Sequence, residues 1–237
     1  MEGLVARAAT VQHTIDAAAR RVGREPGEVT VIAVTKTFPP EAVASAVQAG
    51  FLDVGENYVQ EGQAKRHAFG EQPPPRWHLI GGLQRNKVRA AVATFDRLHT
   101  VDTLALGAVI DAAAQSRGRR LPILLQVNVA NDPAKRGTPP AAAADLARGL
   151  LALPSLALDG LMTIGPQTED PVASRTHFRA LRELRDDLAR GLGVELPHLS
   201  MGMSDDYVIA VEEGATLVRL GRVLLGERQG GPWREGR

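Results

Sequence analysis

The chain of 237 residues is 44% hydrophobic, which is enough for a sizeable core and suits either one α/β barrel or two smaller domains. Its 28 basic and 27 acidic residues give a formal net charge of +1, so there is no basic excess for binding nucleic acid. The absence of cysteine excludes disulfides, zinc–thiolate sites and a catalytic thiol. No apolar run approaches the roughly 18 residues of a membrane span, and residues 1–21 carry charges and lack a secretory cleavage signature. We therefore expect a soluble, cytoplasmic protein with no nucleic-acid, membrane or metal partner.

Hydrophobic periodicity predicts one leading helix and then a regular alternation of strands and helices. Apolar residues from Leu4 to Ala19 recur every three or four positions, which indicates an amphipathic helix over about residues 3–22. Short apolar runs bounded by glycine or proline predict strands at 29–36, 52–55, 76–80, 97–101, 121–129, 156–164, 196–200 and 216–220. Helical periodicity between these runs predicts helices at 40–48, 57–69, 84–93, 103–116, 140–152, 172–190 and 205–213.

Eight strand–helix units after a leading helix predict an α/β fold, a single TIM-type (β/α)8 barrel with an extra N-terminal helix, because parallel strands need helical crossovers. An open doubly wound sheet is the competing architecture. Against it, no Gly-x-Gly-x-x-Gly follows the first strand, and the chain has no Walker lysine loop. We expect one domain over residues 1–237, with the barrel at about 29–228 and a frayed tail at 229–237.

The first predicted strand ends on a lysine. Residues 29–35 are mostly apolar and rich in β-branched side chains, which suits a strand buried on both faces, and Lys36 follows at once. Desolvation lowers the pKa of an ammonium group and exposes a nucleophilic amine, the property that Schiff-base lysines need. The alternative is that Lys36 only extends from the strand end into water.

The segments after the seventh and eighth strands have the composition of an anion site. Residues 200–204 lie between a strand and a helix, with Ser204 as the expected N-cap, and helix starts of this kind offer N–H groups to phosphate. Gly202 and Gly221 allow a ligand to approach the backbone closely. Arg219 lies within a strand and needs a partner. The alternative for this region is an ordinary capped helix.

A lysine after the first strand and a phosphate site after the last two together predict pyridoxal phosphate (PLP). The aldehyde would bond to Lys36, and the phosphate would lie against residues 200–204 and Gly221. Arg219 near the pyridine nitrogen would keep that nitrogen unprotonated and weaken the electron sink on which most PLP catalysts depend. This choice favours a cofactor that is held rather than used for fast turnover.

Eight different short motifs follow one another along residues 29–228: Ala33–Lys36, Gly55–Glu61, Trp77–Lys87, Gln126–Asn128, Lys135–Gly137, Gly160–Met162, Ser200–Ser204 and Val218–Gly221. In these motifs the chain resembles the pyridoxal-phosphate homeostasis protein family, once catalogued as alanine racemase-like proteins. The resemblance implies a single barrel with PLP on Lys36. It implies a cofactor site made of Lys36, Asn57, His78, Ser200, Met201, Gly202, Ser204, Arg219 and Gly221.

The resemblance also implies a biological role. Members of this family are cytoplasmic, are thought to buffer or deliver PLP, and affect amino-acid and keto-acid balance without an assigned robust turnover. The expected partners are PLP and PLP-dependent apo-enzymes, and the expected state is a monomer or a weak dimer. Two positions depart from the family's pattern. Arg222 stands where threonine is usual, so a hydroxyl donor to the phosphate is lost or replaced by a charge, and Gly82 stands where histidine is common.

Other readings of these residues stay open. Asn57 can simply cap the helix that follows it, and His78 can be a satisfied core histidine. A PLP-dependent racemase is the alternative function, but it needs a second acid–base group, and this chain has only Tyr58 and Tyr207 as tyrosines. A barrel enzyme that acts on a sugar phosphate with Lys36 as its base would need no cofactor.

Overall fold

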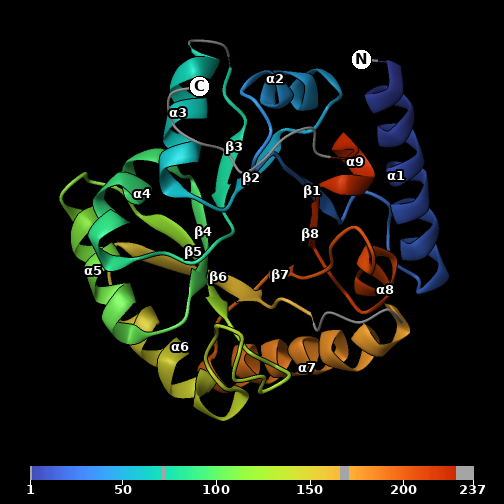
Figure 1. The fold of residues 1–237 in the computed structure, drawn as a ribbon. Coiled ribbons are helices and arrows are strands. Elements are labelled where there is room, and N and C mark those ends of the chain that lie inside the picture. The colour runs from blue at the N-terminus through green and yellow to red at the C-terminus, as the bar shows by residue number, and fades with distance from the viewer. Residues whose placement is uncertain (1, 71–72, 166–170, 228–237) are drawn as a thin grey trace.

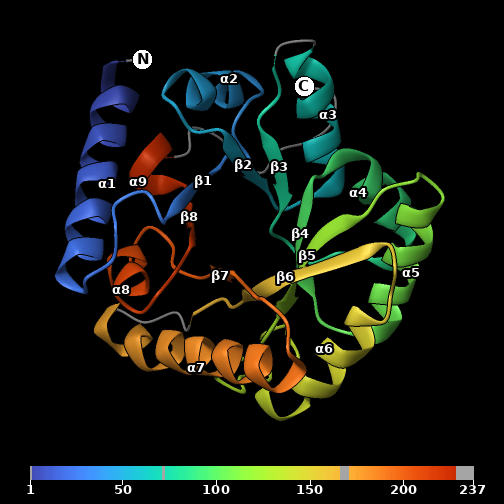
Figure 2. The ribbon, with the colours of Figure 1, turned by 180° about the vertical axis from the view of Figure 1, so that it is seen from behind.

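The computed structural model describes residues 2–70, 73–165 and 171–227. Within these ranges, eight parallel strands pair in chain order and close into a barrel, with the last strand hydrogen-bonded to the first. Helices form a ring around the barrel, which Figures 1 and 2 show from opposite sides. The closed barrel confirms the predicted (β/α)8 architecture and excludes the open doubly wound sheet. The expected tail at 229–237 lies outside the described residues.

The strands are close to their predicted positions, because buried β-branched runs mark them in the sequence. They are β1 (Thr30–Val34), β2 (Asp53–Glu56), β3 (Arg76–Leu79), β4 (Arg97–Val101), β5 (Leu121–Gln126), β6 (Leu156–Met162), β7 (His198–Ser200) and β8 (Leu217–Leu220). The largest difference is at β5, which ends at Gln126 rather than at residue 129, and β1 ends at Val34 rather than at residue 36. Lys36 therefore lies in the turn that follows the strand.

The helices cover the outer face of the barrel. They are α1 (Glu2–Arg21), α2 (Glu41–Gln48), α3 (Val59–Phe69), α4 (Val88–Thr94), α5 (Leu104–Gln115), α6 (Ala143–Leu151), α7 (Ser174–Leu192), α8 (Tyr207–Glu212) and α9 (Arg222–Leu225), with short 3-10 turns at η1 (Arg85–Lys87), η2 (Pro140–Ala142) and η3 (Pro171–Ala173). The leading helix, α1, packs against α8 and α9 (Figures 1 and 2). Helix α9 was not predicted from the sequence, because four residues are too few to show a helical period.

The described part of the chain was searched for membrane-spanning helices and for metal-binding groups of side chains. None of its helices combines the length and the apolar composition that a bilayer crossing needs. In the same residues, histidine and carboxylate side chains form no group of three or more that could hold a metal ion.

The strand register shows which side chains point into the barrel. In parallel sheets, paired residues on neighbouring strands point to the same face, and along a strand every second residue does so. Ile32 of β1 pairs with Asp53 of β2 and with Arg219 of β8. Ile32 also belongs to a small apolar cluster, separate from the main core, with Leu124, Met162 and Leu217. The barrel interior therefore holds an apolar cluster together with Asp53 and Arg219.

The same register places further polar side chains in the barrel interior. Asp53 pairs with Arg76, so His78, two residues further along β3, also points inward. His78 pairs with Arg97, which brings His99 of β4 into the interior in the same way. All of these histidines and Asp53 are buried. One side of this barrel is thus filled by hydrogen-bonding side chains rather than by the branched apolar residues that usually fill such barrels.

Candidate functional site

A pocket of about 470 Å³ opens at the carboxyl ends of the strands. Its walls come from segments far apart in the sequence, since the turn after β1, the end of β2, and the segments that follow β7 and β8 all contribute. The polar residues that line it include Lys36, Asn57, Lys135, Ser204 and Arg219, together with the backbone of Gly221. Ligands of barrel proteins bind at this end of the barrel.

The charge of the lining favours an anion. Among the described residues that line it, four are cationic, namely Lys36, Lys135, Arg219 and Arg222, whereas Asp205 is the one carboxylate. Lys135 donates from Nζ to the carbonyl oxygen of Gly165 at 2.6 Å, which fixes its ammonium group at the pocket. A phosphate or carboxylate ligand would find several cationic donors here.

The backbone on both sides of Lys36 is held by buried hydrogen bonds. Thr35 donates from Oγ1 to Oε1 of Glu56 at 2.5 Å, and the N–H of Thr37 donates to Oε1 of Glu61. Thr37 has a φ of 66°, which is uncommon for a β-branched residue. These two carboxylates therefore hold the turn that presents Lys36, whose side chain is half-buried at the pocket.

A fully buried lysine completes this arrangement. Lys65 of α3 donates from Nζ to the carbonyl oxygen of Thr35 at 2.6 Å and to one oxygen of each of Glu56 and Glu61 at 2.8 Å. Burial raises the pKa of Glu56 to about 7, which the nearby ammonium group of Lys65 only partly offsets. This cluster was not predicted from the sequence. Its signal was the stripe Gly62, Lys65 and Phe69, whose helical spacing places Lys65 on the buried face of the helix.

Arg219 forms part of the pocket from within the barrel. Its side chain is buried, and it donates from Nη1 to Oγ of Ser200 at 2.7 Å and from Nη2 to the carbonyl oxygen of Thr163 at 2.9 Å. Burial lowers the pKa of Arg219 to about 10, so the guanidinium group remains charged at neutral pH. The predicted need for a partner is met by neutral acceptors.

Gly221 leaves space where a side chain would stand. It has a negative φ of −109°, and a Cβ atom built on it would meet only the carbonyl oxygen of Val34 at 3.6 Å and its Cβ at 3.7 Å, both ordinary contacts. The packing of the protein therefore does not demand glycine at this position, whereas a ligand that approaches the backbone would. Ser204 lines the same pocket, and its Oγ accepts a hydrogen bond from the N–H of Val223 at 3.3 Å.

Two expected helix caps are absent. Ser204 does not cap the helix after β7, because α8 begins at Tyr207 with Asp206 at the N-cap position. Asn57 does not cap α3, whose N-cap position is held by Tyr58 without a side-chain hydrogen bond. Both polar side chains are thus available to the pocket that they line.

Four predicted site residues do not line the pocket. Ser200 lies one hydrogen bond behind it, through Arg219. His78 lies deeper in the barrel, where it contacts Asp53 and His99. Met201 is fully buried in the main core. Gly202 has a φ of 90° and packs so closely on α8 that a Cβ atom would lie 2.5 Å from that of Ala210.

The two departures from the family pattern lie at or near the pocket. Arg222 lines it and forms an ion pair with Asp205, and more than half of each side chain is exposed. Gly82 is exposed, and a Cβ atom there would lie 3.0 Å from Nη1 of Arg136. The space next to Gly82 is thus taken by an arginine side chain.

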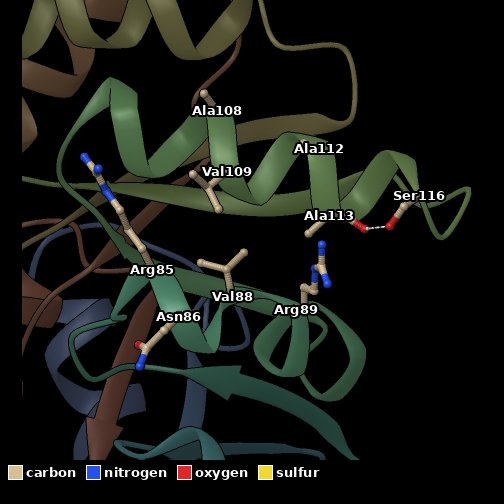
Figure 3. A pocket seen from close by; sticks show the side chains of 9 residues that line it. All are labelled: Arg85, Asn86, Val88, Arg89, Ala108, Val109, Ala112, Ala113 and Ser116. Atoms are coloured by element: carbon tan, nitrogen blue, oxygen red, sulfur yellow. Dashed lines mark hydrogen bonds between the residues drawn. The ribbon is translucent and has the colours of Figure 1, made fainter.

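A second hollow, of about 590 Å³, lies outside the barrel between α4 and α5 (Figure 3). Figure 3 shows Val88 and Val109 pointing toward one another across it, with Arg85 and Arg89 on the side of η1 and α4. None of the residues that end the barrel strands contributes to it. The polar groups converge instead in the pocket of about 470 Å³ at the carboxyl ends of the strands, which is therefore the candidate site.

The chain is similar to known proteins along most of its length. Residues 7–229 match the family described as alanine racemase, N-terminal domain. The pyridoxal phosphate homeostasis protein of Aquifex aeolicus is 40% identical over 94% of this chain and 97% of its own length. The pyridoxal phosphate homeostasis protein of Escherichia coli K12 is 39% identical over 96% of this chain and 98% of its own length.

Solved structures extend the comparison. PipY of Synechococcus elongatus, solved with PLP bound, has a TM-score of 0.84 and 35% identity and covers 94% of this chain and 100% of that one. An alanine racemase of Clostridium difficile has a TM-score of 0.70 at 13% identity, which shows a shared fold alone, over 90% of this chain and 56% of that one. The chain therefore belongs to the pyridoxal phosphate homeostasis protein family, within the larger group that has the alanine racemase N-terminal domain.

Proposed function

We propose that this protein binds pyridoxal 5'-phosphate, with Lys36 as the Schiff-base lysine, and serves in intracellular homeostasis of the cofactor by buffering or delivering it. The observation that carries the proposal is the cationic pocket that joins Lys36 with Arg219, Ser204 and Gly221. The names of the curated relatives and the PLP-bound structure of PipY support it.

The pocket fits PLP in size, charge and donor type. Its volume of about 470 Å³ lies within the roughly 300–1,000 Å³ that is usual for small-molecule sites. Ser204 and the open backbone at Gly221 would hold the phosphate, Arg219 would face the ring nitrogen, and Asn57 is a further polar contact. When bound, PLP supplies an aldehyde that an amine can attack and a ring that can accept electrons.

Arg219 suits this pocket for holding PLP rather than for fast turnover. A guanidinium group has donors and no acceptor, and the pKa of Arg219 stays well above neutral at about 10. A ring nitrogen that faces it therefore accepts a hydrogen bond and remains unprotonated. An unprotonated ring is a weaker electron sink, so the chemistry that most PLP enzymes perform is restrained.

The positions of the tyrosines also support binding over racemisation. A two-base racemase needs a second acid–base group on the other face of the cofactor. Tyr58 is 57% exposed at the start of α3, Tyr207 is buried in the main core, and neither lines the pocket. The racemase-like enzyme thus remains the weaker candidate.

The first test is the absorbance spectrum of the purified protein titrated with PLP, followed by borohydride reduction and peptide mapping. We expect a visible band that borohydride removes and one adduct per chain, on Lys36. The matched control is Lys135→Ala, which removes the other amine that lines the pocket and should leave the Lys36 adduct in place. A folded protein without an adduct, or an adduct spread evenly over surface lysines, would contradict the proposal. It would favour the alternative of a barrel enzyme that acts on a sugar phosphate.

The partners and the location of the protein are part of the same proposal. We expect a cytoplasmic monomer or weak dimer that passes PLP to PLP-dependent apo-enzymes. The reduced electron sink supports this role, because a carrier must hold a reactive aldehyde without consuming it. The check is to mix the PLP-loaded protein with a PLP-dependent apo-enzyme, with and without a trap for free PLP. Activity that appears only without the trap would mean simple release rather than delivery.

A further inference from the structure

A continuous chain of hydrogen-bonded side chains crosses the barrel interior and ends at the pocket. From Arg219, Nη1 contacts Oγ of Ser200 at 2.7 Å, and that oxygen lies 2.9 Å from Nδ1 of His99. Nε2 of His99 lies 2.9 Å from Nδ1 of His78, whose Nε2 lies 2.8 Å from Oδ1 of Asp53. All five side chains are buried, and they come from five different strands.

The chemistry of the two ends sets the direction of every bond in this chain. Arg219 can only donate, so Ser200 accepts from it, and the hydroxyl hydrogen of Ser200 is free to be donated to Nδ1 of His99. The carboxylate of Asp53 can only accept, so His78 presents Nε2–H to it, and a neutral His78 then accepts at Nδ1. His99 therefore donates from Nε2 and accepts at Nδ1. One arrangement satisfies all four bonds with both imidazoles neutral. In it, each group donates to the next one along the path from Arg219 to Asp53.

The surroundings favour this protonation state. Burial lowers the pKa values of His78 and His99, and the neighbouring cations Arg97 and Arg219 act on His99 in the same direction. His198, which is only partly buried, lies near the same group. Burial raises the pKa of Asp53, but hydrogen bonds and charge attraction from His78 and Arg76 together outweigh it, so the pKa is lowered overall.

The chain matters because it links Arg219 to a carboxylate on the other side of the barrel interior. Among the residues that the structure describes, no carboxylate forms an ion pair with Arg219. Asp206 acts on the charge of Arg219 without a direct contact, and the chain itself ends at a second carboxylate, Asp53, which also pairs with the largely exposed Arg76 at 2.8 Å. The imidazoles and the hydroxyl between the two charges are polarised in one direction, which strengthens each bond.

We infer that Asp53, His78 and His99 are positioning residues that hold the guanidinium group of Arg219 as a fixed donor to the ring nitrogen of the bound cofactor. This inference rests on the proposed function and deepens it, because it assigns a ligand-specific role to residues that do not line the pocket. The role is directed at the ring nitrogen and not at the phosphate, which lies toward Ser204 and Gly221. A ligand without that nitrogen is therefore insensitive to the chain.

The first experiment needs no cofactor. Proton–nitrogen correlation spectra of the PLP-free protein, labelled with 15N at histidine, report the tautomer of each imidazole near neutral pH, and His78→Gln and His99→Gln assign the signals. We expect His78 and His99 to be neutral and protonated at Nε2. A proton on Nδ1 of either ring, or a charged imidazolium, would overturn the directed chain.

The second experiment compares PLP with deazapyridoxal phosphate, in which a C–H group replaces the ring nitrogen. His99→Leu removes the hydrogen bonds of His99 with Ser200 and with His78. His99→Gln keeps an amide acceptor for Ser200 and an amide donor for His78. We expect the Leu variant to bind PLP roughly tenfold more weakly and to shift its visible band, and the Gln variant to recover most of both. The deaza analogue should bind all three proteins equally.

The outcomes separate this inference from the function on which it rests. Equal losses for both ligands, or no loss for either, would overturn the positioning role. Failure of the unmodified protein to bind PLP would contradict the proposed function, whereas the histidine tautomers would still test the directed chain. If His99→Leu does not fold, Ser200→Ala breaks the next link, and the same difference between PLP and its analogue is expected.

Discussion

Lys65 is a lysine without exposed surface, and its three acceptors explain how the protein tolerates it. A buried charge is stable only when it is paired and hydrogen-bonded, and Lys65 has two carboxylates and one carbonyl oxygen around Nζ. The same carboxylates bind the side chain of Thr35 and the N–H of Thr37. A single cluster therefore stabilises the fold and fixes the turn that carries Lys36.

Replacing this lysine should be costly. Lys65→Met keeps the volume but leaves Glu56 and Glu61 buried without their cation, and we expect a loss of about 3–5 kcal/mol in the free energy of unfolding. Urea denaturation measures the loss, and the exposed Arg190→Met is the matched control, with little change expected. Adding Glu56→Gln and Glu61→Gln to the Lys65 variant should restore part of the stability. A Lys65→Met protein as stable as the control would mean that the cluster contributes nothing.

Glu56 should make stability depend on pH. Its pKa is raised from 4.5 to about 7 by burial, so between these values the folded protein holds a proton that the unfolded chain releases. The stabilisation is full below pH 4.5 and is lost as the pH rises to 7, by up to about 3 kcal/mol. Glu56→Gln mimics the protonated state, so its unfolding free energy should rise relative to the unmodified protein between pH 5 and 8. If the difference in unfolding free energy between the two proteins, measured by urea unfolding, does not change over that pH range, the raised pKa of Glu56 is contradicted.

At the scale of elements, one glycine sets how β6 meets β7. The pairing of β5 with β6 shifts its register between Ile123 and Leu124, and Gly160 lies at this irregularity. Gly160 has a φ of 155°, and a Cβ atom there would lie 1.9 Å from the carbonyl oxygen of His198. Neighbouring backbone therefore leaves no room for a side chain at this point of the barrel.

We expect Gly160→Ala to lower the free energy of unfolding by about 3 kcal/mol or more, because the methyl group would have to push β7 away. Gly191→Ala is the matched control. It lies in α7 with no atom near its built Cβ, so alanine should stabilise the helix by about 0.5–1 kcal/mol. Thermal unfolding of both variants tests the pair. A tolerated Gly160→Ala would mean that β6 and β7 can separate at little cost.

For the whole molecule, the sequence predicts the barrel well and its interior poorly. Strand–helix alternation is a local property, so the eight units and the residues at their carboxyl ends could be found without a structure. The chain from Asp53 to Arg219 could not, because the positions of five strands around a closed barrel decide which interior side chains meet. His78 was predicted for the cofactor site because it lies in a motif, whereas its contacts are with His99 and Asp53.

The whole protein should become more stable when it binds its ligand, and Gly221 separates this effect from folding. A ligand that binds only the folded state at 100 times its Kd adds about 2.7 kcal/mol to the free energy of unfolding. Gly221→Ala has room for its methyl group, so without ligand its stability should stay within about 1 kcal/mol of the unmodified protein.

The methyl group of Gly221→Ala would nevertheless occupy space at the pocket that the phosphate needs, so most of the gain with PLP should be lost. Urea unfolding with and without PLP measures this gain. Pyridoxal, which lacks the phosphate, is the control ligand and should stabilise both proteins equally. An undiminished gain with PLP in Gly221→Ala would place the phosphate elsewhere in the pocket, on the side of Lys135 rather than beside Ser204.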